Sequence, residues 1–373
     1  MAQFKPFSKN GQYVHKFDYR GSIGGILSLD AKSGGRWLAS GGMYGLEIWD
    51  TEDGSQVKWP EKVWQSTRGA VTSVLWVDAQ DAKDHALFVG TAKGRLALYA
   101  SEQYAGKTRF CELFIANLLL AEPSEILDMS FDRESNRLAL CVRSGLVVLL
   151  RYNHEFHQID VLHYISFREQ GQTVVPKCVA FGAYASNSNE RDMTVFSLYG
   201  GDIGNAIVVG SHIVIDEPTV GAVLYDGRRK CVAAFKVAAT KKMRPRGLAA
   251  SENGRFIVSA SDGGIAFVFD RESTGTQPFD ELHVDEGDWV QTIATSTVGG
   301  VPTIFVAKSR ADLDGDSLIS VWQRRPHIVT EAQMEHVLGS LRIVWEYMKI
   351  AAIILLVFGA GQYVSELYFP RAG

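Results

Sequence analysis

The chain has 373 residues, of which 46 % are hydrophobic and 21 % are charged, and its formal net charge is −4. This composition is typical of a folded globular protein, and the presence of only 10 prolines argues against long disordered segments. The mild negative charge argues against a nucleic-acid-binding protein, because such proteins normally carry a basic field that releases counterions. The length fits two or three domains or one large all-β unit.

The first twenty residues contain no apolar segment of the kind that forms a secretory signal peptide. The cysteines are spread along the chain without any Cys-x-x-Cys pair, at Cys111, Cys141, Cys178 and Cys231. Such spacing is typical of free, mostly buried thiols in a reducing compartment. The sequence therefore predicts a cytoplasmic location for the bulk of the chain, with residues 1–11 as an N-terminal arm.

A hairpin pattern repeats between residues 12 and 325. In residues 36–50, RWLASGGMYGLEIWD, an apolar run leads through a glycine turn into alternating apolar residues that end in Trp-Asp. Residues 255–270, RFIVSASDGGIAFVFD, follow the same plan, and weaker copies begin at His85, Asn136 and Thr303. Period-two alternation on both sides of a glycine turn predicts antiparallel β-hairpins.

Other apolar runs, which we expect to form the innermost strand of each unit, precede the hairpins. These runs are Ile23–Leu29, Val71–Val77, Ile126–Phe131, Val175–Phe181, Arg246–Ala250 and Trp289–Ala294. Apart from one wider gap, they start about 45–55 residues apart, close to the ~40–45 residues of a four-stranded propeller blade. We interpret Asp202–Val237, inside that gap, as the compressed remains of a further blade, so that region 199–240 is degenerate. The prediction is an all-β, closed β-propeller with seven blades, one of them degenerate, or alternatively six.

The two ends of the repeat region complement each other. The last unit ends at Val321-Trp322 without an outer strand, whereas Gln12–Asp18 is a spare strand before the first unit. Pairing of these two segments would close the ring and remove an exposed sheet edge. We therefore expect the first strand of the chain to complete the last blade.

Aromatic-Asp pairs end several of the predicted hairpins, at Trp49-Asp50, Tyr225-Asp226 and Phe269-Asp270, and small residues precede the hairpin turns. In these features residues 12–323 resemble the WD-repeat (WD40) β-propeller family. No blade is preceded by the Gly-His pair of the family pattern, so the buried His-Ser-Asp network of strong repeats is absent. The resemblance implies a rigid ring that binds protein or peptide partners.

After Pro326 the apolar residues recur at helical spacing, through Met334, Val337, Leu341 and Trp345, which predicts an amphipathic helix over residues 326–349. The 16 uncharged residues 350–365 follow as a candidate transmembrane anchor, and residues 366–373 form a short tail. The predicted membrane-embedded side chains are Ile350, Ile353, Ile354, Leu355, Leu356, Val357, Phe358 and Val364. A helix of this length covers about 24 Å of a ~30 Å hydrocarbon core, so flanking Lys and aromatic side chains must meet the shortfall. The alternative is a helix packed on the propeller or on an oligomer partner.

The charges that flank the predicted anchor are asymmetric. Arg324, Arg325, Arg342 and Lys349 precede it, whereas only Arg371 follows it. The positive-inside rule then places the propeller on the cytoplasmic side of an intracellular membrane. We expect the endoplasmic reticulum first and the mitochondrial outer membrane second.

Candidate chemical sites in the sequence are weak. His154, His157 and His163 do not match a metal-ligand spacing, and Asp312, Asp314 and Asp316 fail the calcium-loop pattern at its glycine and final glutamate positions. No nucleophile elbow or phosphate-binding loop is present in the sequence. We therefore expect no catalytic, cofactor or metal residues and no small-molecule substrate.

Two charged loops before neighbouring blades are the candidate partner-binding residues. The acidic group consists of Asp280, Glu281, Asp285, Glu286 and Asp288. The basic group consists of Lys241, Lys242, Arg244 and Arg246. Solvated inter-blade loops are the structural interpretation, and a polar docking rim that steers a partner is the functional one.

These features predict a non-enzymatic protein-interaction scaffold, in which a cytoplasmic WD-repeat propeller is tethered to an organelle membrane. A rigid ring displays loops on two faces, and the anchor raises the local concentration of what binds there. The alternative is a guanine-nucleotide exchange factor for a small GTPase at the endoplasmic reticulum, which rests on the similar order of propeller and anchor in such factors.

Overall fold

The computed structural model describes residues 5–57, 66–77, 85–104, 106–117, 123–172, 174–184, 191–196, 203–237, 244, 246–273, 276–285, 289–309, 316–326, 345 and 347–349. The chain divides into two compact units, Met1–Arg325 and Pro326–Gly373. In the second unit, the described residues 345 and 347–349 are helical. Among the described residues, no helix has the length and apolar character needed to cross a membrane. The predicted anchor, residues 350–365, lies outside the described part of the chain.

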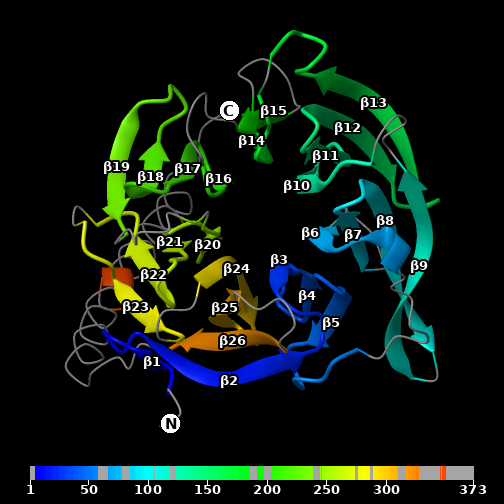
Figure 1. Ribbon diagram of the computed structural model, residues 1–373. Coiled ribbons are helices and arrows are strands. Elements are labelled where there is room, and N and C mark those ends of the chain that lie inside the picture. The colour runs from blue at the N-terminus through cyan, green and yellow to red at the C-terminus, as the bar shows by residue number, and fades with distance from the viewer. Residues whose placement is uncertain are drawn as a thin grey trace, which may run out of the picture. The chain divides into compact units, whose positions relative to one another are not determined.

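In the first unit the described residues form seven antiparallel sheets arranged in a ring (Figure 1). The first three sheets consist of β3 (Ile26–Ala31), β4 (Trp37–Gly42) and β5 (Gly45–Asp50); β6 (Val71–Val77), β7 (Ala86–Thr91), β8 (Arg95–Tyr104) and β9 (Lys107–Asn117); and β10 (Ile126–Asp132), β11 (Arg137–Val142), β12 (Leu146–Asn153) and β13 (Gln158–Ser166). The next two consist of β14 (Cys178–Tyr184) and β15 (Arg191–Phe196); and β16 (Ala206–Val209), β17 (His212–Glu217), β18 (Gly221–Tyr225) and β19 (Cys231–Lys236). The last two consist of β20 (Leu248–Ser251), β21 (Phe256–Ser259), β22 (Ile265–Asp270), β23 (Asp280–His283) and the added β1 (Phe7–Ser8); and β24 (Trp289–Val298), β25 (Val301–Ser309), β26 (Ser317–Arg324) and the added β2 (Tyr13–Gly21).

The innermost strands contact one another in an unbroken circle. In order, β3, β6, β10, β14, β16, β20 and β24 each contact the next, and β24 contacts β3 again. This arrangement is a β-propeller, which confirms the predicted fold class. Six blades have three or more strands, as in the predicted alternative, and the two-stranded sheet β14–β15 lies between two of them.

The degenerate part of the ring is not where the sequence analysis placed it. Residues 206–236, predicted to be a compressed remnant, form the four-stranded sheet β16–β19 with short turns. The reduced sheet is the preceding one, where the described residues form only β14 and β15. Strand β16 starts soon after β15, so a complete blade lies inside the wide gap between the apolar runs Val175–Phe181 and Arg246–Ala250.

Strand β2 closes the ring as predicted. It pairs antiparallel with β26 from Tyr13 opposite Arg324 to Gly21 opposite Ser317. The segment before it continues along the neighbouring blade, where β1 pairs with β23. Both ends of the repeat region are therefore fixed in the ring, which protects two outer strands from edge-to-edge association.

The core lies between adjacent sheets rather than within one layer. Phe256 and Val258 of β21, for example, share a buried cluster with Ile304 of β25 and Trp322 of β26. Side-chain-to-backbone hydrogen bonds add to this packing along the inner strands. Thr295 Oγ1 donates to the carbonyl of Ala250 in the neighbouring blade at 2.6 Å. Burial and these hydrogen bonds together hold the inner strands in a fixed ring.

The four cysteines are free thiols, as expected from their spacing. Cys141 and Cys178 are buried in strands, whereas Cys111 is partly exposed and Cys231 is exposed. The expectation of mostly buried thiols is therefore met by only two of the four.

Candidate functional site

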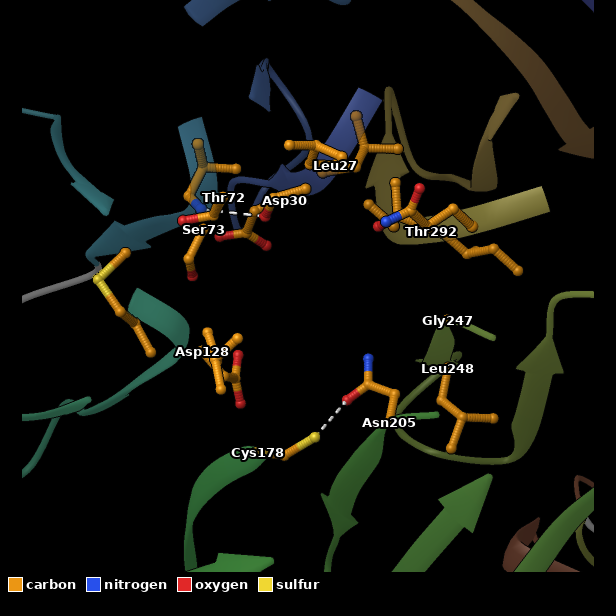
Figure 2. Close-up of a pocket in the computed structure, with 18 of the residues that line it drawn as sticks. Leu27, Asp30, Thr72, Ser73, Asp128, Cys178, Asn205, Gly247, Leu248 and Thr292 are labelled. Carbon is orange, nitrogen blue, oxygen red and sulfur yellow. Dashed lines mark hydrogen bonds between the residues drawn. The ribbon is translucent and has the colours of Figure 1, made fainter. Parts of the chain in front are cut away.

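A cavity of about 470 Å³ lies where the innermost strands meet. All seven blades contribute to its wall, and most of its residues lie in the first half of an inner strand or directly before one. Figure 2 shows Thr72, Asp128, Cys178, Asn205, Gly247 and Thr292 around this space. The cavity therefore forms a mouth of the central channel, on the face where the inner strands begin.

Asp128 is the most perturbed acidic group in this wall. It lies in the first half of β10, and its Oδ2 accepts the backbone N–H of Val179 in β14 at 2.9 Å. Burial raises the pKa of Asp128 to about 7, although hydrogen bonds from the backbone of Val179 and Met129 oppose this effect. The carboxyl group makes no ion pair with any described residue, so a cationic or N–H-donating group that enters the mouth would stabilise its ionised form.

Cys178 and Asn205 lie beside each other in the wall (Figure 2). The Cys178 thiol donates to Asn205 Oδ1 at 3.3 Å, and the same oxygen accepts the backbone N–H of Ala206 at 2.7 Å. Burial raises the pKa of the Cys178 thiol well above its ordinary value, and the charge of Asp128 adds to this effect. The thiol is therefore protonated at neutral pH and acts as a hydrogen-bond donor rather than as a nucleophile.

The wall combines these groups with hydroxyls that connect the blades. Ser28 Oγ accepts the backbone N–H of Val74 at 3.0 Å, and Thr72 Oγ1 donates to the carbonyl of Ile126 at 2.7 Å. In the described part of the chain no group of three or more His, Cys, Asp or Glu side chains could hold a metal ion. The geometry suits the binding of a polar group by a rigid wall.

Two of the predicted partner-binding residues are buried inside the propeller. Asp280 is fully buried in β23, so it belongs to a strand rather than to the predicted loop. Its carboxylate accepts the Ser8 hydroxyl at 2.6 Å and the backbone N–H groups of Asn10, Gln12 and Tyr13 at 2.9, 3.0 and 3.1 Å. Asp280 therefore fixes the N-terminal arm and is not part of an exposed rim.

Arg246 is the other buried residue of the predicted set. Its guanidinium forms an ion pair with Asp216 Oδ1 of β17 at 2.7 Å, and both side chains are almost fully buried. Its Nη2 also donates to the carbonyl of Glu217 at 2.8 Å. Burial raises the pKa of Asp216 to about 6, against the opposing charge of Arg246. The pair connects two neighbouring blades, so Arg246 stabilises the ring and is not part of an exposed rim.

The other described members of the two charged groups already have partners within the chain. Glu281 forms an ion pair with Lys9 at 2.6 Å. Asp285 pairs with Lys308 at 2.7 Å, and the Arg244 guanidinium lies 5.0 Å from the ring centre of Trp289. Asp285 and Arg244 lie close to the beginnings of β24 and β20, on the face of the channel mouth. Glu286, Asp288, Lys241 and Lys242 lie outside the described residues, and a docking role for the exposed members stays a prediction.

Sequence analysis did not identify Asp128, Cys178 or Asn205 as a group. A signal for Asp128 was present, because it is an acidic residue inside the apolar run Ile126–Phe131 that was assigned to an inner strand. An acidic side chain at a buried strand position indicates either a structural hydrogen bond or a binding wall. The proximity of the three residues depends on the order of the blades around the ring, which their spacing in the sequence does not show.

Comparison with known proteins adds no family assignment. No model of a known protein family matches the chain, and no curated protein matches it.

Proposed function

We propose that the chain is a non-enzymatic WD-repeat scaffold whose propeller binds a protein partner at the channel mouth. A membrane segment at residues 350–365 would tether it to an intracellular membrane, with the endoplasmic reticulum as our first choice. The observation that carries the binding proposal is the polar cavity at the mouth, with the carboxyl group of Asp128 in its wall.

The wall is suited to recognition because it is held in place from several blades at once. The hydrogen bonds of Asp128 and Thr72 fix backbone segments of adjacent inner strands. A preorganised site loses little conformational entropy when a partner binds. An Arg or Lys side chain, or the N–H groups of an extended peptide, would match the hydrogen-bonding capacity of Asp128 and Asn205.

Support for the tether comes from sequence chemistry. The 16 residues 350–365 carry no charged side chain, and basic residues are more frequent before this segment than after it. An anchored propeller would hold its partner at the membrane and raise the local concentration of the pair.

The binding proposal is tested by proximity labelling of the full chain in cells, with wild type and Asp128→Asn in parallel. Asparagine keeps the shape and can still accept the Val179 N–H, but it cannot carry the charge. We expect the labelling of a specific neighbour to fall at least about tenfold, since hydrogen bonds to a charged group contribute roughly 1.5–3 kcal/mol. The matched control is Asp53→Asn, at an exposed aspartate in the turn after β5, on the other face of the ring. Equal labelling by Asp128→Asn and wild type would contradict binding at the mouth.

The tether is tested separately by deleting residues 342–373. We expect the full chain to sediment with membranes and to resist extraction at high salt, and the shortened chain to be soluble. A full chain that is already soluble would remove the membrane part of the proposal and leave the binding part intact.

The predicted alternative, nucleotide exchange on a small GTPase, is separated by a nucleotide-release assay with the full chain. A scaffold leaves the release rate of a labelled nucleotide unchanged, whereas an exchange factor accelerates it many-fold. Accelerated release that Asp128→Asn abolishes would assign the mouth to the exchange reaction instead.

A further inference from the structure

The face of the propeller opposite the channel mouth is formed by the turns where inner strands end and by the tips of the outer hairpins. We call it the exit face, because β26 ends there at Arg324 and the chain leaves the propeller unit at Arg325. The guanidinium of Arg324 contacts Glu252, in the turn that follows β20. Arg271, after β22, donates to the carbonyl of Val209 at the end of β16, at 3.5 Å. Turns from three neighbouring blades therefore share this face.

Outer hairpins of other blades reach the same face. Asp53 in the turn after β5 and Tyr104 in the β8–β9 tip line one hollow of about 1070 Å³. Leu113 of β9 and Phe156 in the β12–β13 tip line another, of about 610 Å³. The described hairpin tips of these blades thus lie on the exit face.

Two of these tips display aromatic side chains to solvent. Tyr104 is 61 % exposed and Phe156 is 66 % exposed. The tip that carries Phe156 is held in one conformation, because Asn153 Oδ1 accepts the backbone N–H of Glu155 at 3.0 Å and of Phe156 at 3.4 Å. Burial of these two side chains against an apolar or interfacial layer would be favourable.

A third tip, between β18 and β19, displays positive charge. Arg228, Arg229 and Lys230 are exposed there. Asp226 Oδ1 accepts the backbone N–H groups of Arg228 and Lys230 at 2.9 and 2.8 Å. Arg229 adopts a φ of 61°, in the left-handed region that non-glycine residues rarely occupy. The Asp226 carboxylate offsets part of the positive charge of Arg228 and Lys230, so the turn presents three exposed cations beside one carboxylate in a fixed arrangement.

We propose that the exit face lies against an anionic bilayer, with Arg228, Arg229 and Lys230 at the lipid phosphates and Tyr104 and Phe156 in the interfacial layer. Cations and amphipathic aromatic rings are the two side-chain classes that such a surface attracts. The inference rests on the proposed membrane tether. Residues 326–349 connect Arg325, where the chain leaves the propeller unit on this face, with the predicted anchor. The channel mouth, on the other face, would then point to the cytoplasm.

The test uses the propeller unit, residues 1–325, which forms a compact unit and closes its ring internally through β2 and β26. Its flotation is measured with phosphatidylcholine vesicles and with vesicles that also contain phosphatidylserine. We expect binding to the anionic vesicles only, with loss of binding at high salt. Replacing all three cations, Arg228→Gln, Arg229→Gln and Lys230→Gln, should weaken binding about a hundredfold, at ~1 kcal/mol per basic residue near the surface.

The aromatic contribution is tested by the double variant Tyr104→Ser and Phe156→Ser, with an expected loss of at least about tenfold. The matched control is Tyr44→Ser, at a tyrosine that is 54 % exposed in the β4–β5 turn on the opposite face, and it should bind like wild type. Equal binding to neutral and anionic vesicles, or no effect of the triple variant, overturns the inference. Because the unit lacks the predicted anchor, this failure is distinct from failure of the tether, which fractionation of the full chain reports.

Discussion

The ring closure and the two-stranded sheet β14–β15 are attached to their neighbouring strands by different kinds of interaction. At the closure, β2 pairs with β26 along its whole length, and β1 extends the neighbouring blade. The buried carboxylate of Asp280 collects one hydroxyl and three backbone N–H groups of the N-terminal arm. The closure is therefore secured by more interactions than a strand pairing alone provides.

The described part of β14–β15 contacts its neighbours through buried apolar clusters and through channel-wall groups. Asp128 accepts the N–H of Val179 on one side, and the thiol of Cys178 donates to Asn205 on the other. Both hydrogen bonds use side chains that also line the cavity. The described part of β14–β15 thus lies beside the most perturbed groups of the candidate site.

The sharpest test of the closure is Asp280→Ala. The substitution leaves three backbone N–H groups, of which that of Tyr13 is buried, and the Ser8 hydroxyl without their acceptor, so we expect the free energy of unfolding to fall by about 3 kcal/mol. Urea denaturation at neutral pH measures this loss. The neighbouring Glu281→Ala removes a partly exposed ion pair with Lys9 and should cost less than about 1 kcal/mol. Similar losses of unfolding free energy for the two variants would contradict the role of Asp280 in fixing the N-terminal arm.

The next test concerns the buried pair on the far side of β14–β15, between β17 and the segment before β20. Arg246→Met leaves Asp216 buried and unpaired, so we expect a loss of about 3 kcal/mol in the free energy of unfolding. The double variant Arg246→Met and Asp216→Leu removes both charges and should recover most of that loss. If the double variant is as unstable as the single one, the expected recovery fails. The loss would then come from the missing ion pair and not from the unpaired charge of Asp216.

The closure was predictable from the sequence because it depends on simple complementarity, with a spare strand at one end and a missing strand at the other. The hairpins at residues 36–50 and 255–270 were predictable for the same reason, since alternation and a glycine turn are local signals. The role of Asp280 was not, because its partner Tyr13 lies 267 residues away along the chain. An acidic residue near other acidic residues has the appearance of a solvated loop until the arm that covers it is known.

The location of the reduced sheet was misassigned for a related reason. The apolar run at Val175–Phe181 has a normal inner-strand pattern, and the blade in residues 206–236 starts much sooner after it than the 45–55-residue spacing of the other units predicts. What distinguishes β14–β15 is the small number of strands described after that run. The residues of the channel site come together because β10, β14 and β16 are neighbours in the ring. The sequence alone does not show that these strands are adjacent.

The pH dependence of the free energy of unfolding tests how much the buried carboxyl group of Asp128 destabilises the propeller when it ionises. Burial raises the pKa of Asp128 to about 7, above its ordinary value of 3.8. The native state therefore retains a proton that the unfolded chain has lost, and the contribution of Asp128 to stability falls as the pH rises from about 4 to above 7. Asp128→Asn cannot lose a proton, so we expect it to match wild type near pH 4 and to be more stable by about 3 kcal/mol at pH 8.

Urea denaturation of both proteins at the two pH values measures this difference, with Asp53→Asn as the exposed control that should change stability by less than about 0.5 kcal/mol. A pH-independent difference between Asp128→Asn and wild type would contradict the titration of Asp128 in the wall. The expected result also connects stability to recognition. Above pH 7 the folded propeller carries an ionised carboxylate without an ion-pair partner among the described residues, and a cationic group of a bound partner would recover the energy lost by leaving it unpaired. Partner binding should therefore strengthen over the same pH range in which the free propeller becomes less stable, and Asp128→Asn should abolish both trends together.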